Sequence, residues 1–242
     1  MAERRRLDAE LVRRALARSR AEAAELVASG HVFVSGAPAD KVTRLVAPHE
    51  PLTVSAPPAR FVGRGGWKLE AALTAFALDV AGREVLDAGA STGGFTDCLL
   101  QSGASRVVAV DVGRGQLHER LRADPRVVSM ERTDIRDVEG SFSLVVADLS
   151  FISLRTVAAK LVALTAPGGD LVVLVKPQFE AGRSEASRGR GVIRDPAVRA
   201  AALRTVIGAF ESEGAANMGV VESPLKGADG NVEFLAHFRR GV

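Results

Sequence analysis

The sequence predicts an α/β protein in which a Rossmann-like parallel sheet follows a small α+β domain. A glycine-rich turn joins a short apolar strand to a helix at residues 84–97, as in nucleotide-binding folds. Strand and helix patterns then alternate, which is typical of a parallel sheet covered by helices. Residues 1–58 instead show two short helical patterns followed by short strands. We therefore expect an N-terminal domain at 1–58, a linker at 59–66 and the larger domain at 67–242.

Composition narrows the functional class. The chain has 242 residues, of which 47% are hydrophobic and 25% charged, as is usual for a globular protein. Its clearest aliphatic run, residues 171–175, is far shorter than the roughly 20 residues that span a bilayer. No charged-then-apolar signal segment opens the sequence, and the single Cys98 excludes an internal disulfide and zinc-type spacing. We expect a cytoplasmic protein without a metal or a membrane partner.

Positive charge is concentrated in two places, although the net charge is only +3. Residues 1–20 hold seven arginines against three acidic residues, and residues 183–204 hold six against two. Two basic segments on a nearly neutral chain suggest contact with a polyanion at separate places. Solubility and ion pairing along helix surfaces are the alternative explanation for either segment.

The N-terminal domain begins with a helical apolar pattern over residues 7–16. Ser19 and Glu22 form a capping-box motif that predicts a second helix, which would end at Gly30. Strands are expected at 31–34, 41–46 and 52–54, before a Pro-Pro linker.

This segment resembles the small RNA-binding domain first described in ribosomal protein S-four. The resemblance rests on the arginine-rich first helix, on Ala-Ala-Glu-Leu-Val in the second, and on Gly-His-Val-Phe-Val-Ser-Gly at 30–36. It implies that arginines contact the RNA backbone, as phosphate neutralisation requires. The RNA-binding candidates of the whole chain are Arg4, Arg5, Arg6, Arg13, Arg14, Arg18, Arg20, Arg60, Arg64, Arg188 and Arg190.

The glycine-rich turn is the first candidate cofactor site. Its glycines allow the backbone to approach a ligand, and the following helix offers unpaired N–H groups. The spacing differs from the dinucleotide motif, and the acid at its entrance suits a positively charged cofactor, so S-adenosylmethionine is favoured over NAD. The candidate cofactor residues in this turn are Asp87, Gly89, Ser91, Thr92, Gly93, Gly94 and Phe95.

Polar residues follow the other predicted strands, at 106–110, 127–130, 144–147 and 171–175. Asp111 is placed to bind ribose hydroxyls, and Asp134 to accept from an adenine amino group, although Asp134 also suits an ordinary turn. Asp148 and Lys176 end the last two of these strands. Because ligands of open α/β sheets lie beyond the carboxyl ends of the strands, we expect these side chains to lie together.

The remaining elements suggest a substrate-binding loop and a closing pair of strands. A helix opens at Trp67 and carries Lys68 in its first turn, where a positive charge is unfavourable. Residues 178–194 read as a loop, and Asp195-Pro196 begin another helix. The final strands are expected at 217–222 and 231–238, with Glu233 inside the last one.

Five motifs resemble those of the hemolysin A (TlyA) family. They are the turn at 87–97, Asp-Val-Gly-Arg-Gly-Gln-Leu at 111–117, Ala-Asp-Leu-Ser-Phe-Ile-Ser at 147–153, Val-Lys-Pro-Gln-Phe-Glu at 175–180, and the segment 223–233. The resemblance implies a Rossmann-like S-adenosylmethionine methyltransferase that modifies the 2′-hydroxyl of cytidine in ribosomal RNA of one or both subunits. Related FtsJ-type enzymes carry a Lys-Asp-Lys-Glu tetrad, which falls here on Lys68, Asp148, Lys176 and Glu233.

These residue types suit methyl transfer to a ribose hydroxyl, which is a poor acid and benefits from a base and from close placement. Lys176 is the expected central residue, with Asp148 holding it and Glu233 orienting Lys68 or the ribose. A nearby second ammonium favours the neutral form that a basic lysine needs. Alternatively, Lys176 only hydrogen-bonds the hydroxyl, or the tetrad consists of two surface ion pairs.

The sequence also departs from the family pattern. It ends at Val242, where some members continue into a further helix, and residues 59–61 lack a tryptophan found in some members. The subunit that is modified therefore stays open. Three other functions remain as alternatives: a non-catalytic RNA-binding ribosome assembly factor, a membrane-lytic protein, which the absence of spanning patterns disfavours, and a nicotinamide dehydrogenase.

Overall fold

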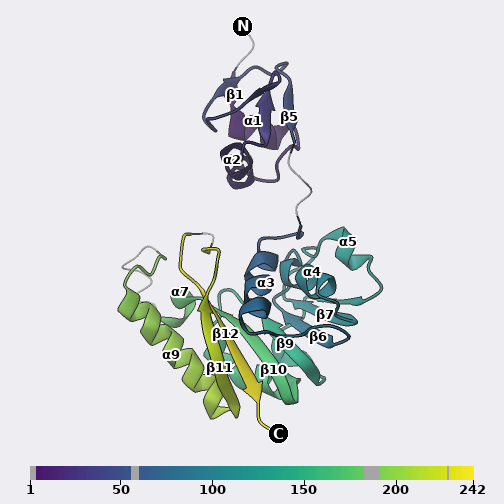
Figure 1. Cartoon of the computed structure of the whole chain (residues 1–242), viewed down its shortest axis with the longest axis vertical. Helices are drawn as coiled ribbons and strands as arrows, with labels where there is room; N and C mark the ends of the chain where they lie inside the picture. The colour runs from purple at the N-terminus through teal and green to yellow at the C-terminus, as the bar shows by residue number, and fades with distance from the viewer. Residues whose placement is uncertain (1–3, 56–59, 183–190, 228) are drawn as a thin grey trace. The chain divides into compact units, whose positions relative to one another are not determined.

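A computed structural model describes residues 4–55, 60–182, 191–227 and 229–242 (Figure 1). The chain divides into two compact units, Met1–Arg60 and Phe61–Val242, which are considered separately. Residues 61–66, expected in the linker, belong to the second unit. The candidates Arg188 and Arg190 lie outside the described residues.

The first unit packs two helices against short strands. Its helices are α1 (Leu7–Arg13) and α2 (Arg20–Ala28). Its strands are β1 (Arg5–Arg6), β2 (Val32–Val34), β3 (Ala37–Pro38), β4 (Leu45–Val46) and β5 (Leu52–Val54). They form a β3-β2-β5 sheet and a separate β1-β4 pair. The core contains Leu7, Leu11, Val27, Val32 and Val34, so the main apolar residues of the predicted helices face inward. The first helix ends at Arg13, however, and Ala15 of the predicted pattern is exposed.

The caps of α2 confirm part of the capping-box prediction. The Ser19 hydroxyl accepts from the Glu22 N–H at 3.2 Å. The Glu22 carboxylate, however, reaches back to the Arg18 N–H at 2.6 Å instead of to Ser19. It also pairs with the Arg18 guanidinium, which draws it one residue further back. Gly30 takes a positive φ of 73°, as expected of a residue that ends a helix.

One strand prediction for this unit needs correction, and two short strands, β1 and β3, were not predicted. The strand expected at 41–46 forms only at Leu45–Val46, and its partner β1 was not predicted. Arg5 and Arg6 pair antiparallel with Val46 and Leu45. Both residues of β1 are exposed and carry charge, so no apolar alternation marks this strand in the sequence.

The second unit alternates strands and helices. Its strands are β6 (Glu84–Ala88), β7 (Arg106–Asp111), β8 (Val127–Glu131), β9 (Phe142–Ala147), β10 (Thr165–Val175), β11 (Ala215–Glu222) and β12 (Phe234–Arg240). Its α-helices are α3 (Gly65–Ala75), α4 (Gly94–Gln101), α5 (Glu119–Arg122), α6 (Ala158–Leu164), α7 (Pro177–Glu180) and α9 (Pro196–Ser212), with short 3₁₀ turns η1 (Ile135–Asp137) and η2 (Leu154–Thr156). Glu233 lies immediately before β12, so its predicted place inside the last strand is wrong.

The sheet has the order β11-β12-β10-β9-β6-β7-β8. Neighbours from β10 to β8 run parallel, whereas β12 is antiparallel to both β10 and β11. The chain proceeds from β6 outward through β7 to β8, and then returns to β9 on the other side of β6. This reversal between β6 and β9 is the place where open α/β sheets bind ligands.

Both faces of the sheet are covered. Along β9, Val145 and Ala147 belong to one buried cluster, and Leu144 and Val146 to the other. Residues of α6 and α9 join the first cluster, and residues of α3 and α4 the second, so the helices lie on opposite faces (Figure 1). Burial on both faces explains why these strands read as continuous apolar runs. Among the described residues, no helix has the length and hydropathy that a bilayer crossing requires.

Candidate active site

The glycine-rich turn crosses the reversal point in close contact with the end of β9. Gly89 has a φ of 85°, and a Cβ on it would lie 2.6 Å from the Asp148 carbonyl oxygen. Gly93 also has a positive φ, and a side chain there would meet Leu117 and Leu121. Both positions require glycine, the first for close approach of the two strand ends and the second for packing beneath the turn.

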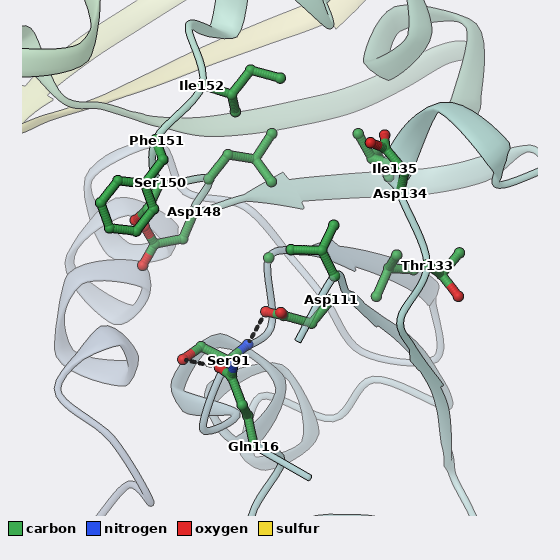
Figure 2. Close-up of a pocket in the computed structure, with 14 residues that line it drawn as sticks. Ser91, Asp111, Gln116, Thr133, Asp134, Ile135, Asp148, Ser150, Phe151 and Ile152 are labelled. Atoms are coloured by element: carbon green, nitrogen blue, oxygen red, sulfur yellow. Dashed lines mark hydrogen bonds between the residues drawn. The ribbon is translucent and has the colours of Figure 1, made fainter. Parts of the chain in front are cut away.

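A cavity of about 400 Å³ opens beside this turn (Figure 2). This volume is within the usual range for small-molecule sites, about 300–1,000 Å³. The residues that line it come from the carboxyl ends of several strands: Gly89, Ser91, Val110, Asp111, Val112, Gln116, Thr133, Asp134, Ile135, Asp148, Leu149, Ser150, Phe151 and Ile152. The predicted residues Gly89, Ser91, Asp111, Asp134 and Asp148 are therefore brought together.

Asp111 fixes the loop geometry on one side of the cavity. Its Oδ2 accepts from the Ser91 N–H at 2.8 Å, and its Oδ1 from the Gly113 N–H at 2.7 Å. The Ser91 hydroxyl also donates to Gln116 Oε1 at 3.2 Å (Figure 2). Each carboxylate oxygen keeps a further lone pair, so Asp111 can still accept from hydroxyl groups in the cavity.

Asp134 lies on another wall and begins the turn η1. Its carboxylate accepts from the Arg136 N–H at 2.9 Å and pairs with the Arg136 guanidinium at 2.5 Å. These contacts lower the pKa of Asp134 to about 2, so its carboxylate is charged near neutral pH. Asp134 therefore both caps the turn η1 and lines the cavity.

Asp87 lies beneath the turn and is fully buried. Its Oδ2 accepts from the Thr96 hydroxyl at 2.6 Å, while its Oδ1 has no hydrogen-bond partner among the described residues. Burial raises the pKa of Asp87 to about 7, and the neighbouring charges of Asp148 and Asp111 act in the same direction. The carboxyl group therefore supports the loop from below and titrates near neutrality.

A second cavity of about 190 Å³ extends from the turn toward Lys176. Thr92, Gly94 and Phe95, predicted as cofactor residues, line it together with Arg64, Asp148 and Ser150. Gly94 opens α4, and its Cα packs against the 63–66 backbone so closely that a Cβ would lie 2.9 Å from the Gly66 nitrogen. Two segments of the second unit thus meet at this cavity.

The four residues of the predicted tetrad form two lysine–carboxylate pairs. Lys176 Nζ lies 2.6 Å from Asp148 Oδ1 and donates to the Ser150 hydroxyl at 2.7 Å. Lys68 Nζ donates to Glu233 Oε2 at 2.5 Å. Both lysines are only 8% exposed, so these are not surface ion pairs.

Sequence reasoning missed several residues of the site. Ser150 contacts Lys176, and Phe151 is 93% exposed at the edge of the larger cavity, with a strained φ of 67°. The Phe151 ring lies 5.5 Å from the ring of Phe179. Gln116, Leu149 and Ile152 also line the cavity without having been predicted. The sequence offered two signals for Ser150 and Phe151: their place shortly after Asp148 at a strand end, and their occurrence in the family motif at 147–153.

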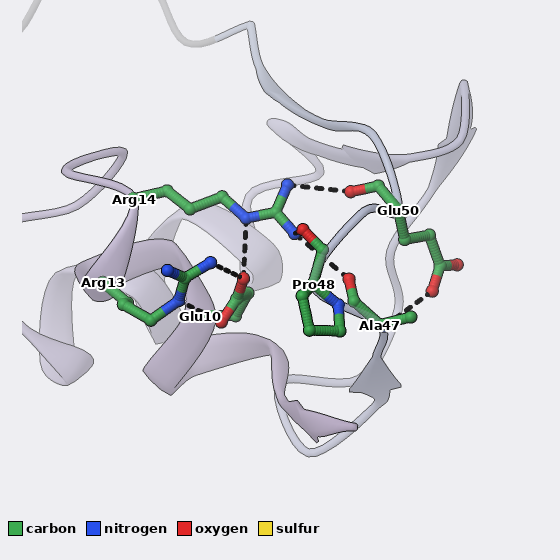
Figure 3. Close-up of polar contacts among 6 residues, drawn as sticks. All are labelled: Glu10, Arg13, Arg14, Ala47, Pro48 and Glu50. Carbon is green, nitrogen blue, oxygen red and sulfur yellow. Dashed lines mark hydrogen bonds and ion pairs between the residues drawn. The ribbon is translucent and has the colours of Figure 1, made fainter. Parts of the chain in front are cut away.

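The arginines predicted to bind RNA differ in their surroundings. Arg14 is largely buried: it pairs with Glu10 at 2.7 Å and donates to the carbonyl oxygens of Ala47, Pro48 and Glu50 at 3.1, 2.9 and 2.8 Å (Figure 3). These contacts fold the turn after β4 onto α1. All three guanidinium nitrogens thus donate within the first unit, which sequence alone did not indicate.

The other described arginines of this group are more exposed, and several share carboxylate partners. Arg6 and Arg20 both pair with the buried Asp8, at 2.9 and 2.8 Å, and Arg13 pairs with Glu10 at 2.6 Å. In the second unit, Arg64 donates to the Lys226 carbonyl at 3.2 Å. Arg4, Arg5 and Arg60 lie at exposed positions, so most of the predicted set is accessible.

No group of three or more His, Cys, Asp or Glu side chains suited to a metal occurs in the part of the chain that the structure describes.

Comparison with known proteins agrees with this geometry. The S4 domain family matches residues 5–51, and the family described as FtsJ-like methyltransferase matches residues 61–240. A Mycobacterium tuberculosis protein named 16S/23S rRNA (cytidine-2'-O)-methyltransferase TlyA is 51% identical, across 99% of this chain and 91% of its own. Hemolysin A of Brachyspira hyodysenteriae is 38% identical, across 96% of this chain and 99% of its own.

Among solved structures, one described as a hemolysin from Streptococcus thermophilus has 39% identity and a TM-score of 0.77. The match covers 100% of this chain and 90% of that one. Family matches to both units and relatives along the full length agree with each other. The chain belongs to the hemolysin A (TlyA) family, in which an S4 domain precedes an FtsJ-like methyltransferase domain.

Proposed function

We propose that the protein transfers a methyl group from S-adenosylmethionine to the 2′-hydroxyl of cytidine in ribosomal RNA. The observation that carries the proposal is the ion pair of Lys176 with Asp148 at the carboxyl ends of adjacent strands, next to a cavity of cofactor size. The 51% identical relative is named for this reaction on 16S and 23S rRNA. Ribosomal RNA as the substrate would place the protein in the cytoplasm.

The larger cavity fits S-adenosylmethionine by its size and by the chemistry of its walls. Asp111 would accept from the ribose hydroxyls, and Asp134 from the adenine amino group. Ile135, Leu149 and Ile152 offer apolar contact for the flat base. The Asp148 carboxylate lines the cavity and favours a positively charged ligand, and the buried Asp87 beneath the turn would add to this effect in its ionised form. Backbone groups of the turn from Gly89 to Gly94, with Thr92 and Phe95, would hold the remaining methionine portion.

When bound, S-adenosylmethionine would supply a methyl group on a positively charged sulfur. The protein's own task is to present a ribose hydroxyl in line with that methyl and to receive its proton. Lys176 is held by both Asp148 and Ser150, so its Nζ is fixed at the mouth of the smaller cavity. We propose that the Lys176 amine, after releasing its ammonium proton to water, hydrogen-bonds the hydroxyl and takes up its proton as the methyl group passes from sulfur to the ribose oxygen.

Lys68 and Glu233 would form the other half of the ribose site. Their close pair fixes the Lys68 ammonium beside the Glu233 carboxylate. Both carboxylates of the tetrad therefore act by placing lysines.

The exposed arginines would bind the RNA backbone. Phosphates would be neutralised by Arg4, Arg5, Arg6, Arg13, Arg18, Arg20 and Arg60 of the first unit and by Arg64 of the second. The predicted set also includes Arg188 and Arg190. Arg14 is the exception, because its guanidinium is occupied by Glu10 and by three carbonyl groups.

The test is to incubate purified protein with S-adenosylmethionine and unmodified small and large ribosomal subunits, and to map modified nucleotides by mass spectrometry. We expect 2′-O-methylcytidine in one or both RNAs. Methylation of a base instead of a ribose, or no transfer despite binding to the subunits, would contradict the proposal. The second outcome would favour a non-catalytic assembly factor.

A further inference from the structure

Two segments that follow neighbouring strands run side by side, so that successive residues of one contact successive residues of the other. Residues 148–154 follow β9, and residues 176–180 follow β10. Lys176 Nζ donates to the Ser150 hydroxyl at 2.7 Å, and the Phe179 ring lies 5.5 Å from the Phe151 ring. Further along, Glu180 accepts from Ser153 and from Leu154. The segment that borders the cavity is thus held at three successive points.

Glu180 makes the last and most buried of these contacts. Its residue is 6% exposed, although its helix α7 has only four residues. Its Oε2 accepts from the Ser153 hydroxyl at 2.5 Å, and its Oε1 from the Leu154 N–H at 2.7 Å. The Arg155 Nε lies 3.6 Å from Oε2. A buried carboxylate with hydrogen bonds to both oxygens fixes its partners firmly, because leaving either oxygen unsatisfied is costly.

The segment held by Glu180 adopts a conformation that needs support. Phe151 takes a left-handed φ of 67° and exposes 93% of its surface at the edge of the cavity (Figure 2). A bulky non-glycine residue in this region of φ/ψ space is strained, and it persists only where surrounding contacts determine it. The contact of Ser150 with Lys176 lies on one side of Phe151, and the contacts of Ser153 and Leu154 with Glu180 lie on the other.

We propose that Glu180 is a positioning residue for methyl transfer: through Ser153 and Leu154 it holds the 150–151 segment so that Ser150 meets Lys176 and Phe151 faces the bound nucleotide. This inference rests on the proposed function. Glu180 touches neither cavity in the described structure. Its effect must therefore pass through Ser150 and Phe151. Substitutions of Glu180 and of Phe151 should then have coupled effects on kcat.

The test is a double-mutant cycle on full-length protein with ribosomal subunits as substrate. Glu180→Gln leaves one carbonyl oxygen to serve two donors, so we expect kcat to fall by roughly tenfold to a hundredfold, as small misplacements of reacting groups do. The dissociation constant of S-adenosylhomocysteine should change by a smaller factor than kcat, because Asp111 and the glycine turn are untouched and only the 149–152 wall of the cavity is affected. The exposed Glu211 on α9 supplies a matched control, Glu211→Gln, with unchanged kcat.

The cycle adds Phe151→Ala. If Glu180 acts through this segment, most of its effect is already lost once Phe151 is replaced. The kcat of the double variant should then lie within about twofold of the kcat of Phe151→Ala alone. Multiplying effects would instead show that Glu180 only stabilises the fold, and an unchanged kcat for Glu180→Gln would equally refute the inference. If Glu180→Gln does not fold, Ser153→Ala removes one of the donors and must show the same coupling. Absence of transfer by the wild type would refute the proposed function itself.

Discussion

The Lys68 ammonium and the Glu233 carboxylate, 165 residues apart in the sequence, meet at 2.5 Å in the interior of the second unit. Lys68 lies in the first turn of α3, and Glu233 directly precedes β12. A Cβ on Gly227 would lie 2.5 Å from Glu233 Oε1, so the backbone of the preceding loop packs on this carboxylate. The pair connects both ends of the methyltransferase domain.

This burial predicts a large effect of removing one partner. Glu233→Gln leaves the Lys68 charge buried without its counter-ion, so the free energy of unfolding should fall by about 3–5 kcal/mol. Urea denaturation measures it. The matched control is Glu84→Gln, whose partner Arg106 and own side chain are 51% and 48% exposed. That change should cost less than about 1 kcal/mol, and equal losses in the two variants would contradict the buried pair.

Arg14 should matter for folding of the first unit more than for RNA contact. Arg14→Ala removes the hydrogen bonds to the turn at 47–50 and leaves Glu10 with fewer partners, so we expect a loss of about 2–4 kcal/mol in stability. Arg18→Ala, at an exposed pair with Glu22, should lose less than about 1 kcal/mol. Thermal denaturation distinguishes them. An Arg14→Ala protein as stable as wild type, but weaker in RNA binding, would show that Arg14 is a phosphate contact.

Asp87 predicts a specific pH dependence of stability. Its folded pKa of about 7 lies above the ordinary aspartate value, so between about pH 4 and 7 the folded state binds more protons than the unfolded state. Its contribution to stability is therefore present at low pH and is lost as pH rises toward 7, by roughly 1.4 kcal/mol per unit. The stability of Asp87→Asn relative to wild type should increase over this range in chemical denaturation. A constant difference would refute the buried titration.

The two acids of the cofactor cavity should respond differently to the same substitution. Asp111→Asn turns an amide N–H toward the N–H of Ser91 or Gly113 and removes an acceptor, so the dissociation constant of S-adenosylhomocysteine should rise roughly tenfold to a hundredfold. Asp134→Asn keeps an oxygen that can accept from an amino group, and we expect less than about a fivefold change. Calorimetry gives both constants. Equal losses would show that Asp134 shares the ribose.

Much of the fold could be predicted because parallel strands buried on both faces have a simple pattern. The sequence segments that form β7, β9 and β10 are largely apolar. Asp111 is the last residue of β7, and Asp148 and Lys176 directly follow β9 and β10. Topology then brings strand ends to one edge, so the meeting of Asp148 with Lys176 followed from local pattern and general rules.

The rest depends on tertiary contacts that leave no local signal. The pairing of Lys68 with Glu233 was implied by family resemblance alone, because no spacing rule connects residues so far apart. Arg14 and its neighbour Arg13 look alike in sequence, and only the turn at 47–50 distinguishes them. The exposure of Phe151 likewise has no local signal, and its aromatic partner Phe179 lies on another segment of the chain.

The most direct test of the account compares wild type with Lys176→Ala for 2′-O-methylcytidine formation on ribosomal subunits, together with binding of S-adenosylhomocysteine by calorimetry. Lys160→Ala on α6 is the matched control and should behave as wild type. We predict that Lys176→Ala shows no detectable 2′-O-methylcytidine while its dissociation constant stays within about threefold of wild type, because the cofactor walls are unchanged. Full methyl transfer by Lys176→Ala would contradict the assigned role of Lys176.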